Sequence, residues 1–178
     1  MHYKKLVKRH KTQEKQKMEK KWWHHLTAYQ IYTRSFCDSN GDGIGDFQGI
    51  ISKLDYLQEL GIGAIWISPF NDSPNYDNGY DISDYYAILK DFGTMADLEE
   101  MIQECEKRDI IVMMDLVLNH CSHEHPWFLG ACKDRNGKYH DYYIWEEGTE
   151  DQPPEGSAAF FGGNVWEWVP QVKEYYYH

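Results

Sequence analysis

The chain has 178 residues, 16% of them aromatic, and a formal net charge of −11. This length allows one domain of ordinary size with a sizeable core. Residues 1–21 hold nine of the 18 basic residues and two of the 29 acidic ones, so the remaining 157 residues carry a net charge of −18. Such an acidic body repels nucleic acid and anionic membranes, which excludes both as main partners.

Targeting and redox features favour a reduced, cytoplasmic protein without a membrane span. No apolar run approaches the length of about 18 residues that a span needs, and no apolar segment follows the basic start as in a secretory signal. The four cysteines show neither CxxC pairing nor zinc-type spacing. They are Cys37, Cys105, Cys121 and Cys132.

Residues 1–21 are polar and rich in lysine, and we expect them to form a disordered tail. Met18 begins the sequence Met-Glu-Lys-Lys-Trp-Trp, which is a plausible alternative start. In that case residues 1–17 would be an upstream extension.

From residue 28 the pattern predicts alternating strands and helices. Residues 28–32 fit a short strand, and residues 48–60 have apolar side chains at helical spacing. Gly61 is expected to end that helix, because glycine tolerates the left-handed conformation common there. Residues 64–68 fit a buried strand that ends at Pro69.

The next predicted helix begins at Thr94, which forms a capping-box pattern with Asp97. Residues 110–118 are almost continuously apolar, as is typical of a strand buried on both faces. This βαβαβ order predicts a parallel sheet with helical crossovers, an α/β fold.

After Asn119 the sequence is rich in Gly, Pro, Trp and Tyr and has no long helical period, so an irregular segment is expected. The last residues, Tyr175 to His178, resemble the interior of a strand. Because natural C-termini are more often polar and frayed, we expect the sequence to be part of a longer protein.

A first motif spans residues 38–46, where oxygen donors alternate with glycines. This spacing suits a hard cation such as calcium, which takes six to eight oxygen ligands. Gly49 stands where an EF-hand has its glutamate, so the loop is of another kind. A capped, Asp/Gly-rich turn without metal is the alternative. The proposed ligands are the side chains of Asp38, Asn40, Asp42 and Asp46 and the carbonyl of Ile44.

Two further motifs follow predicted strands. Residues 77–81 read Asp-Asn-Gly-Tyr-Asp, and residues 115–120 read Asp-Leu-Val-Leu-Asn-His. Alone, each is more simply a solvated turn or a loop histidine. In a βα barrel, however, the chemistry lies at the carboxyl ends of strands, which favours a shared site. Asp115, inside an apolar run, needs a partner because burying an unpaired charge is costly.

These motifs, in this order, resemble glycoside hydrolase family 13 of the α-amylase superfamily, and in particular its oligo-1,6-glucosidases, dextran glucosidases and related α-glucosidases. The resemblance covers roughly residues 22–178. Besides the motifs, it is carried by Trp22-Trp23, Tyr29-Gln30-Ile31-Tyr32, residues 61–69, Phe92-Gly93-Thr94-Met95, residues 123–128 and residues 141–145.

The resemblance implies a TIM-type (β/α)8 barrel, of which this chain holds only a part. Residues 22–119 would be its first three βα units, and residues 120–178 an irregular domain inserted after the third strand. Asp77 would hydrogen-bond the outer hydroxyls of the non-reducing glucose, Tyr80 would stack under that glucose, and His120 would donate to its 6-hydroxyl.

The resemblance also implies supporting residues. Asp115 would be a buried acid that orients an active-site arginine, with Asn119 beside it at the strand end. Phe161, next to Phe160, would close the pocket from the inserted domain. Cys121 departs from the family, which usually has threonine there.

The implied function is that of a retaining exo-α-glucosidase acting on short α-gluco-oligosaccharides. Such enzymes need a carboxylate nucleophile and a carboxylic acid about 5–5.5 Å apart. In the family these follow the fourth and fifth barrel strands, so we expect neither in these 178 residues and no activity from them alone. A trehalose-6-phosphate hydrolase and a non-catalytic transporter heavy subunit are the alternatives. Linkage preference and oligomeric state stay open.

Overall fold

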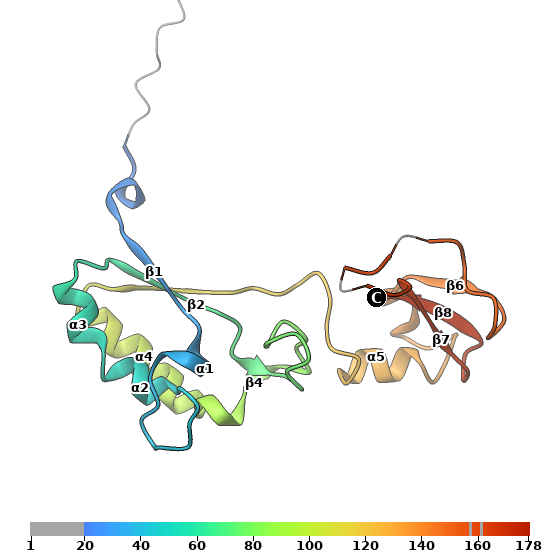
Figure 1. The fold of residues 1–178 in the computed structure, drawn as a ribbon, viewed down its shortest axis with the longest axis horizontal. Coiled ribbons are helices and arrows are strands. Elements are labelled where there is room, and N and C mark those ends of the chain that lie inside the picture. The colour runs from blue at the N-terminus through green and yellow to red at the C-terminus, as the bar shows by residue number, and fades with distance from the viewer. Residues whose placement is uncertain (1–19, 157, 161) are drawn as a thin grey trace, which may run out of the picture.

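The computed structural model describes residues 20–156, 158–160 and 162–178. The predictions for residues 1–19 and for Phe161 therefore lie outside the described residues. The described elements form two groups joined by an extended segment (Figure 1). We call residues 28–114 the parallel-sheet region and residues 126–177 the α5–β8 region.

The parallel-sheet region contains the expected parallel sheet. Its strands β1 (Ala28–Ile31), β2 (Ala64–Ile67) and β5 (Ile111–Met114) lie in the order β1-β2-β5. Both pairs are parallel, and Ile31, Ile67 and Met114 are in register at the last position of each strand. The carboxyl ends of the three strands therefore meet at one edge of the sheet. The predicted α/β class with an incomplete barrel sheet is confirmed.

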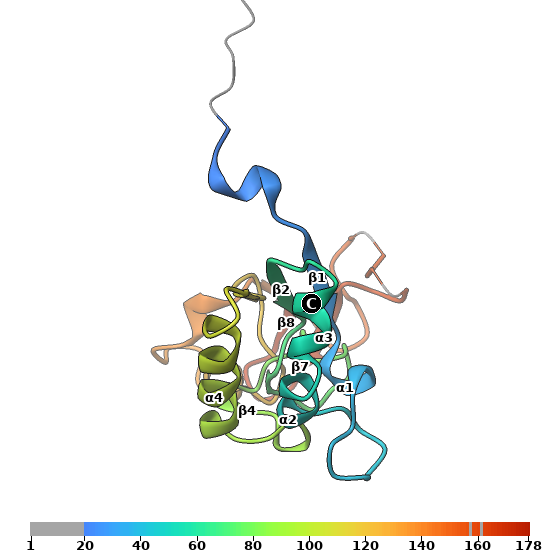
Figure 2. The same ribbon diagram turned by 90° about the vertical axis from the view of Figure 1, so that its left-hand side faces the viewer.

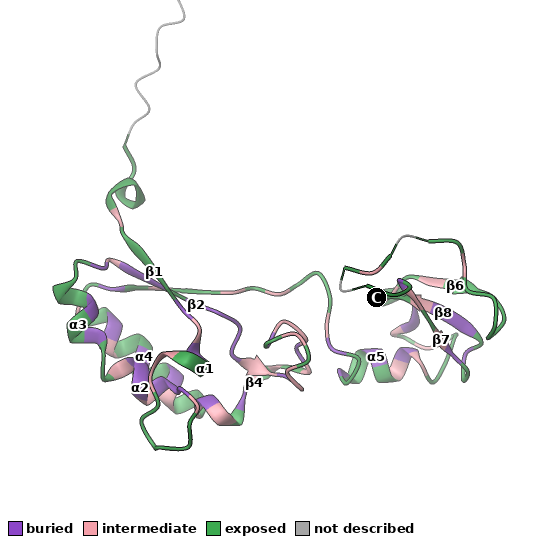
Figure 3. Ribbon diagram, viewed as in Figure 1, coloured by how far each residue is buried: buried purple, intermediate pink, exposed green. Residues whose placement is uncertain are grey.

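Helices cover one face of this sheet, as Figure 2 shows from the side. They are α1 (Thr33–Phe36), α2 (Phe47–Ile51), α3 (Leu54–Glu59) and α4 (Met95–Glu106), with short 3-10 turns at Trp22–His25 and Lys90–Phe92. An aliphatic core lies between helices and strands and includes the fully buried Ile50, Leu57, Ile65, Ile67 and Met101. In Figure 3 the buried residues follow this layer.

The single helix predicted over residues 48–60 is wrong in one respect, because the structure has two helices there. α2 ends at Ile51 and α3 begins at Leu54. The Ser52 hydroxyl donates to the Gly49 carbonyl at 2.7 Å, and the Lys53 amide turns to the Ile50 carbonyl at 2.9 Å. These tighter bonds break the α-helical ladder, while Leu54 continues the buried face. Gly61 ends α3 with a φ of +82°, as expected.

The third predicted strand is shorter and more exposed than expected. β5 stops at Met114, and Asp115 lies just beyond it. Met113 is 41% exposed and Leu116 is 77% exposed. The prediction of burial on both faces is therefore wrong for the described chain. The reason is that β5 is the edge strand of this sheet and the helices cover only one of its faces.

A small antiparallel pair follows β2. β3 (Asn71–Asp72) pairs with β4 (Asp84–Ile88), and its register shifts between the two β3 residues. The pair projects residues 73–83 as a loop beyond the carboxyl end of β2.

The α5–β8 region consists of the helix α5 (Pro126–Ala131), a 3-10 turn at His140–Tyr142 and three antiparallel strands. These are β6 (Trp145–Glu147), β7 (Trp166–Val169) and β8 (Glu174–Tyr177), in the order β6-β8-β7. As expected, α5 is a short helix rather than a long periodic one, and the final aromatic residues form a strand. The domain boundary at residue 120 stays a prediction.

Candidate functional site

The candidate site lies beyond the carboxyl ends of β2 and β5. The loop that follows β2 carries residues 77–81, and the segment that follows β5 carries residues 115–120. Because β2 and β5 are adjacent and parallel, two motifs about 40 residues apart in sequence come together at one edge. In βα barrels, the active-site residues likewise lie at the carboxyl ends of the parallel strands.

The Asp81 carboxylate organises the 77–81 turn. It accepts hydrogen bonds from the Ser73 hydroxyl at 2.9 Å and from the backbone amides of Tyr76 and Asp77 at 2.8 and 3.1 Å. Gly79 has a φ of +96°, and a Cβ there would lie 3.0 Å from the Pro69 carbonyl oxygen. Asp81 therefore supports the loop and does not face a ligand.

Asp115 joins the two motifs. One of its carboxylate oxygens accepts the indole N–H of Trp66 at 3.1 Å, and the other accepts the hydroxyl of Tyr80 at 3.0 Å. The resemblance implied a buried acid inside a strand, next to an arginine. In the described chain, Asp115 follows β5, is half-buried, and is hydrogen-bonded by an indole and a phenol.

Tyr80 is protonated at neutral pH, and these contacts favour that state further. Burial raises the pKa of the Tyr80 phenol, and its hydrogen bond to Asp115 and the negative charges of Asp115 and Asp77 raise it further. Tyr80 is thus a neutral ring held by its hydroxyl. A ring of this kind can stack against the apolar face of a sugar.

His120 has one consistent protonation pattern. Its Nε2 lies 3.1 Å from the Tyr80 carbonyl oxygen, which can only accept, so Nε2 must carry the hydrogen. Its Nδ1 lies 3.3 Å from the side-chain nitrogen of Asn119, which can donate to it. The neutral Nε2–H tautomer satisfies both contacts, so Asn119 supports His120 directly.

Asp77 is half-buried beside these groups. Its backbone carbonyl accepts the Tyr80 amide at 3.0 Å, but within the described part of the chain its carboxylate accepts no hydrogen bond. The carboxylate is therefore available to the hydroxyls of a ligand. Phe161 belongs to the predicted site but lies outside the described residues.

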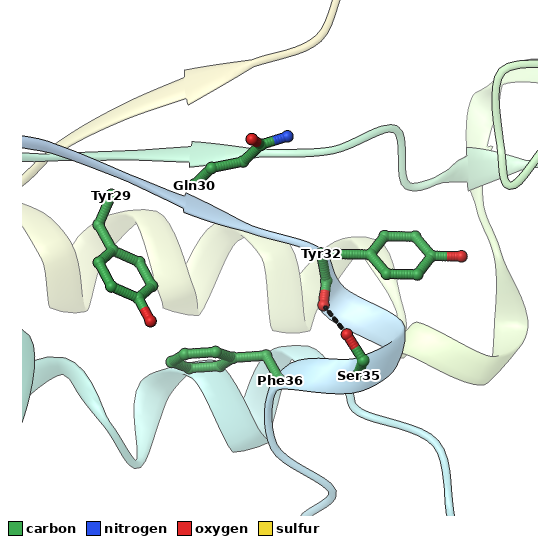
Figure 4. Close-up of a pocket in the computed structure, with 5 residues that line it drawn as sticks. All are labelled: Tyr29, Gln30, Tyr32, Ser35 and Phe36. Atoms are coloured by element: carbon green, nitrogen blue, oxygen red, sulfur yellow. Dashed lines mark hydrogen bonds between the residues drawn. The ribbon is translucent and has the colours of Figure 1, made fainter.

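A hollow of about 410 Å³ lies next to the site, at the end of β1. Its lining residues are Tyr29, Gln30, Tyr32, Ser35 and Phe36, and in Figure 4 the ring of Tyr32 points away from those of Tyr29 and Phe36. Tyr32 instead donates to the Asn78 side chain at 3.4 Å. Polar groups do not converge in this hollow, so we assign the site to the strand ends.

The proposed calcium loop is ordered by its own hydrogen bonds. Asp38 accepts the amides of Asn40, Gly41 and Gly43 at 2.7–3.0 Å, and these backbone bonds hold the pKa of its carboxyl below the usual value. Asp42 likewise accepts the amide of Ile44.

Asp46 is the buried N-cap of α2. It accepts the Gly49 amide, and its other oxygen accepts both the amide and the hydroxyl of Ser39. Among the described residues, no group of three or more His, Cys, Asp or Glu side chains is arranged to hold a metal ion. The donor types suit calcium, but the Asp46 carboxylate is occupied, so calcium binding stays a prediction.

Two residues of the site were missed from the sequence. Trp66 was assigned only to a buried strand, although a tryptophan among aliphatic strand residues was a usable signal. Tyr85 lies outside every motif, yet its hydroxyl contacts the backbone of residues 116–121, which we call the His120 segment. Only the pairing of β3 with β4 brings it there.

Comparison with known proteins places the chain in a family. The family model described as "Alpha amylase, catalytic domain" matches residues 30–178. The oligo-1,6-glucosidase of Bacillus cereus is 56% identical over 161 residues, which are 90% of this chain and 29% of that protein. The glucan 1,6-alpha-glucosidase of Streptococcus pneumoniae is 52% identical, with the same coverage.

Among solved structures, the trehalose-6-phosphate hydrolase of Bacillus licheniformis matches with a TM-score of 0.85 and 48% identity, over 89% of this chain and 29% of that one. This chain therefore spans less than a third of the length of each of these relatives. No helix in the described part of the chain is long and apolar enough to cross a membrane.

Proposed function

The chain belongs to the α-amylase family of glycoside hydrolases, and from this premise we propose that it provides part of the glucose pocket of a retaining exo-α-glucosidase. The substrates would be short α-gluco-oligosaccharides, and the proposed activity is of the oligo-1,6-glucosidase type. The observation that carries the proposal is the convergence of Tyr80, Asp115 and His120, next to the open carboxylate of Asp77, at the ends of β2 and β5.

In this pocket each side chain has a separate task. The Asp77 carboxylate accepts the outer hydroxyls of the terminal glucose, and the Tyr80 ring stacks under the sugar. The Nε2–H of His120 donates to the 6-hydroxyl, for which it must leave the Tyr80 carbonyl. Asp115 and Asn119 hold Tyr80 and His120 in place. Phe161, which lies outside the described residues, would close the pocket from the inserted domain, as the family resemblance implies.

The nucleophile and the acid of the double displacement would come from parts of the relatives that this chain does not match. We therefore expect residues 1–178 alone to show no turnover. A cytoplasmic location and a structural calcium ion in the 38–46 loop complete the proposal.

A trehalose-6-phosphate hydrolase is the second candidate, because such an enzyme is among the similar solved structures. The acidic composition of the chain argues against it, because residues 22–178 carry a net charge of −18, which disfavours a phosphorylated substrate. The transporter heavy subunit has no specific observation in its favour.

The test is a chimera in which the 161 matched residues of this chain replace those of the Bacillus cereus oligo-1,6-glucosidase. The chimera should hydrolyse isomaltose and 4-nitrophenyl α-glucoside, and Asp77→Ala or His120→Ala should lower kcat/KM by about 100-fold because the glucose loses its position. Residues 1–178 alone serve as the negative control. A preference for trehalose 6-phosphate would favour the second candidate.

Unchanged kinetics in both variants would contradict the assigned roles. Turnover by residues 1–178 alone that survives repurification would place a catalytic pair within this chain.

A further inference from the structure

The hydroxyl of Tyr85 lies where two backbone carbonyls of the His120 segment converge. It is 2.8 Å from the carbonyl oxygen of Val117 and 2.8 Å from that of His120. Both oxygens can only accept, so the single phenolic O–H is their common donor. A residue of β4 thus contacts the segment that carries the predicted sugar-binding histidine.

The His120 segment has little other backbone support. Its first anchor is the Asp115 amide, which lies 3.4 Å from the Ile67 carbonyl, and its next is the Ser122 amide, which donates to Ile82 at 2.9 Å. Between these anchors, within the described part of the chain, the backbone of residues 116–121 is hydrogen-bonded only by Tyr85. These residues form neither helix nor strand.

Tyr85 itself is well placed to act as a support. Its backbone belongs to β4, and its carbonyl accepts the side-chain amide of Asn71 at 3.0 Å. Its half-buried ring packs edge-to-face on His125, with the ring centroids 5.6 Å apart. The hydroxyl is a protonated donor at neutral pH, and burial raises its pKa further above the usual value.

We propose that Tyr85 is a positioning residue, whose hydroxyl fixes the turn at residues 117–120 and thereby sets His120 relative to Tyr80 and Asp77. The inference rests on the proposed function, because it assigns His120 to sugar binding. Tyr85 does not touch the sugar. It acts through the backbone carbonyls of Val117 and His120.

The test uses Tyr85→Phe in the chimera, which removes one oxygen and keeps the ring on His125. Tyr86→Phe is the matched control, since the neighbouring Tyr86 is 92% exposed. With 4-nitrophenyl α-glucoside, Tyr85→Phe should lower kcat/KM by about tenfold, because small misplacements near the reacting centre slow catalysis. Tyr86→Phe should leave kcat/KM unchanged.

A double-mutant cycle separates positioning from a general loss of structure. If Tyr85 acts through His120, then Tyr85→Phe should cost almost nothing further in the His120→Ala background. Equal losses in both backgrounds would overturn the proposal, as would unchanged kcat/KM per mole of folded enzyme combined with a lower Tm.

The same cycle separates the proposed sugar-binding function of His120 from the positioning role of Tyr85. An active chimera in which His120→Ala is silent would contradict the proposed function. An active chimera that is sensitive to His120→Ala but not to Tyr85→Phe would contradict only the positioning role.

Discussion

The parallel-sheet region and the α5–β8 region are stabilised by different kinds of side chain. The first has a continuous core between its helices and strands that is mostly aliphatic, with Phe47, Phe70 and Phe92 among its members. In the second, Phe128 stacks on Trp145 with centroids 6.3 Å apart and meets Tyr176 edge-to-face at 4.8 Å. It also buries His140 and Glu174 beside each other, whereas the buried carboxylate of the first region, Asp46, caps a helix. Stability in the second region therefore depends more on specific partners than on apolar area.

The buried Glu174 is the sharpest instance of this difference. One carboxylate oxygen lies 3.0 Å from the guanidinium of Arg135, and the other lies 3.0 Å from Nε2 of His140. The His140 contact is close but does not have hydrogen-bond geometry, and Arg135 contacts Glu174 as an ion pair while it donates its hydrogen bond to Glu147. His140 is in turn stacked on Trp145, with centroids 4.5 Å apart.

The largest expected effect in this comparison is that of Glu174→Ala. Arg135 is half-exposed and keeps Glu147 as a partner, so the group left without its partner is the buried His140, at a cost of about 1–3 kcal/mol in the free energy of unfolding. Chemical unfolding of the chimera, followed by tryptophan fluorescence, measures it. Glu147→Ala is the control, because Glu147 also pairs with Arg135 but is 76% exposed. Equal, small losses in both variants would remove the distinction between the two regions.

The same difference explains what could be predicted from the sequence. In the parallel-sheet region, Leu54, Leu57 and the Thr94–Asp97 capping box are local signals, and each indicated the element in which it lies. The break at Ser52 was missed because side-chain bonding to Gly49 competes with a helical pattern that continues on both sides. In the α5–β8 region, contacts between aromatic rings hold the strands together, and these contacts leave no regular spacing of apolar residues in the sequence.

The candidate site was predictable only in part. The motifs at Asp77 and His120 could be placed at strand ends, because a parallel sheet brings such ends together. Their partners could not. The contact of Trp66 with Asp115 joins residues 49 apart, and that of Tyr85 with His120 joins residues 35 apart. Such contacts depend on strand register and side-chain direction, which a single sequence does not specify.

Calcium would sharpen the comparison by adding an ionic stabiliser to the parallel-sheet region, within the loop of residues 38–46. At ten times its Kd, a ligand that binds only the folded state adds about 1.4 kcal/mol. Calcium should therefore raise the Tm of the chimera, and it should do so less in Asp42→Ala than in the parent. The measured quantity is the calcium-dependent shift, so the variant's own destabilisation cancels. A shift of zero in both proteins would contradict calcium binding by this loop.

The smallest expected effect concerns the start of α4, where the stabilisation is local. The Asp97 carboxylate accepts the Thr94 amide at 2.7 Å and the Gln48 side chain at 2.9 Å. Bonding from the Thr94 hydroxyl, then from Gln48, then from the Thr94 amide lowers the pKa of Asp97 below its usual value of 3.8. A lowered folded-state pKa means that the carboxylate stabilises the fold above the unfolded pKa. That stability is lost as the pH falls through the folded value.

Asp97→Asn should accordingly cost about 1 kcal/mol at neutral pH, the usual value of a helix cap. The difference in unfolding free energy between parent and variant should begin to shrink as the pH falls below the unfolded pKa of about 3.9, where the unfolded carboxyl takes up a proton. It should be lost once the pH is below the lowered folded pKa, where the folded carboxyl is protonated too. Glu99→Gln, at an exposed carboxylate of the same helix, is the control and should show almost no difference at either pH. A difference for Asp97→Asn that stays constant down to about pH 2.5 would mean that the capping box acts through shape and not through charge. The start of α4 would then resemble the aliphatic core beneath it more than the ionic cluster around Glu174.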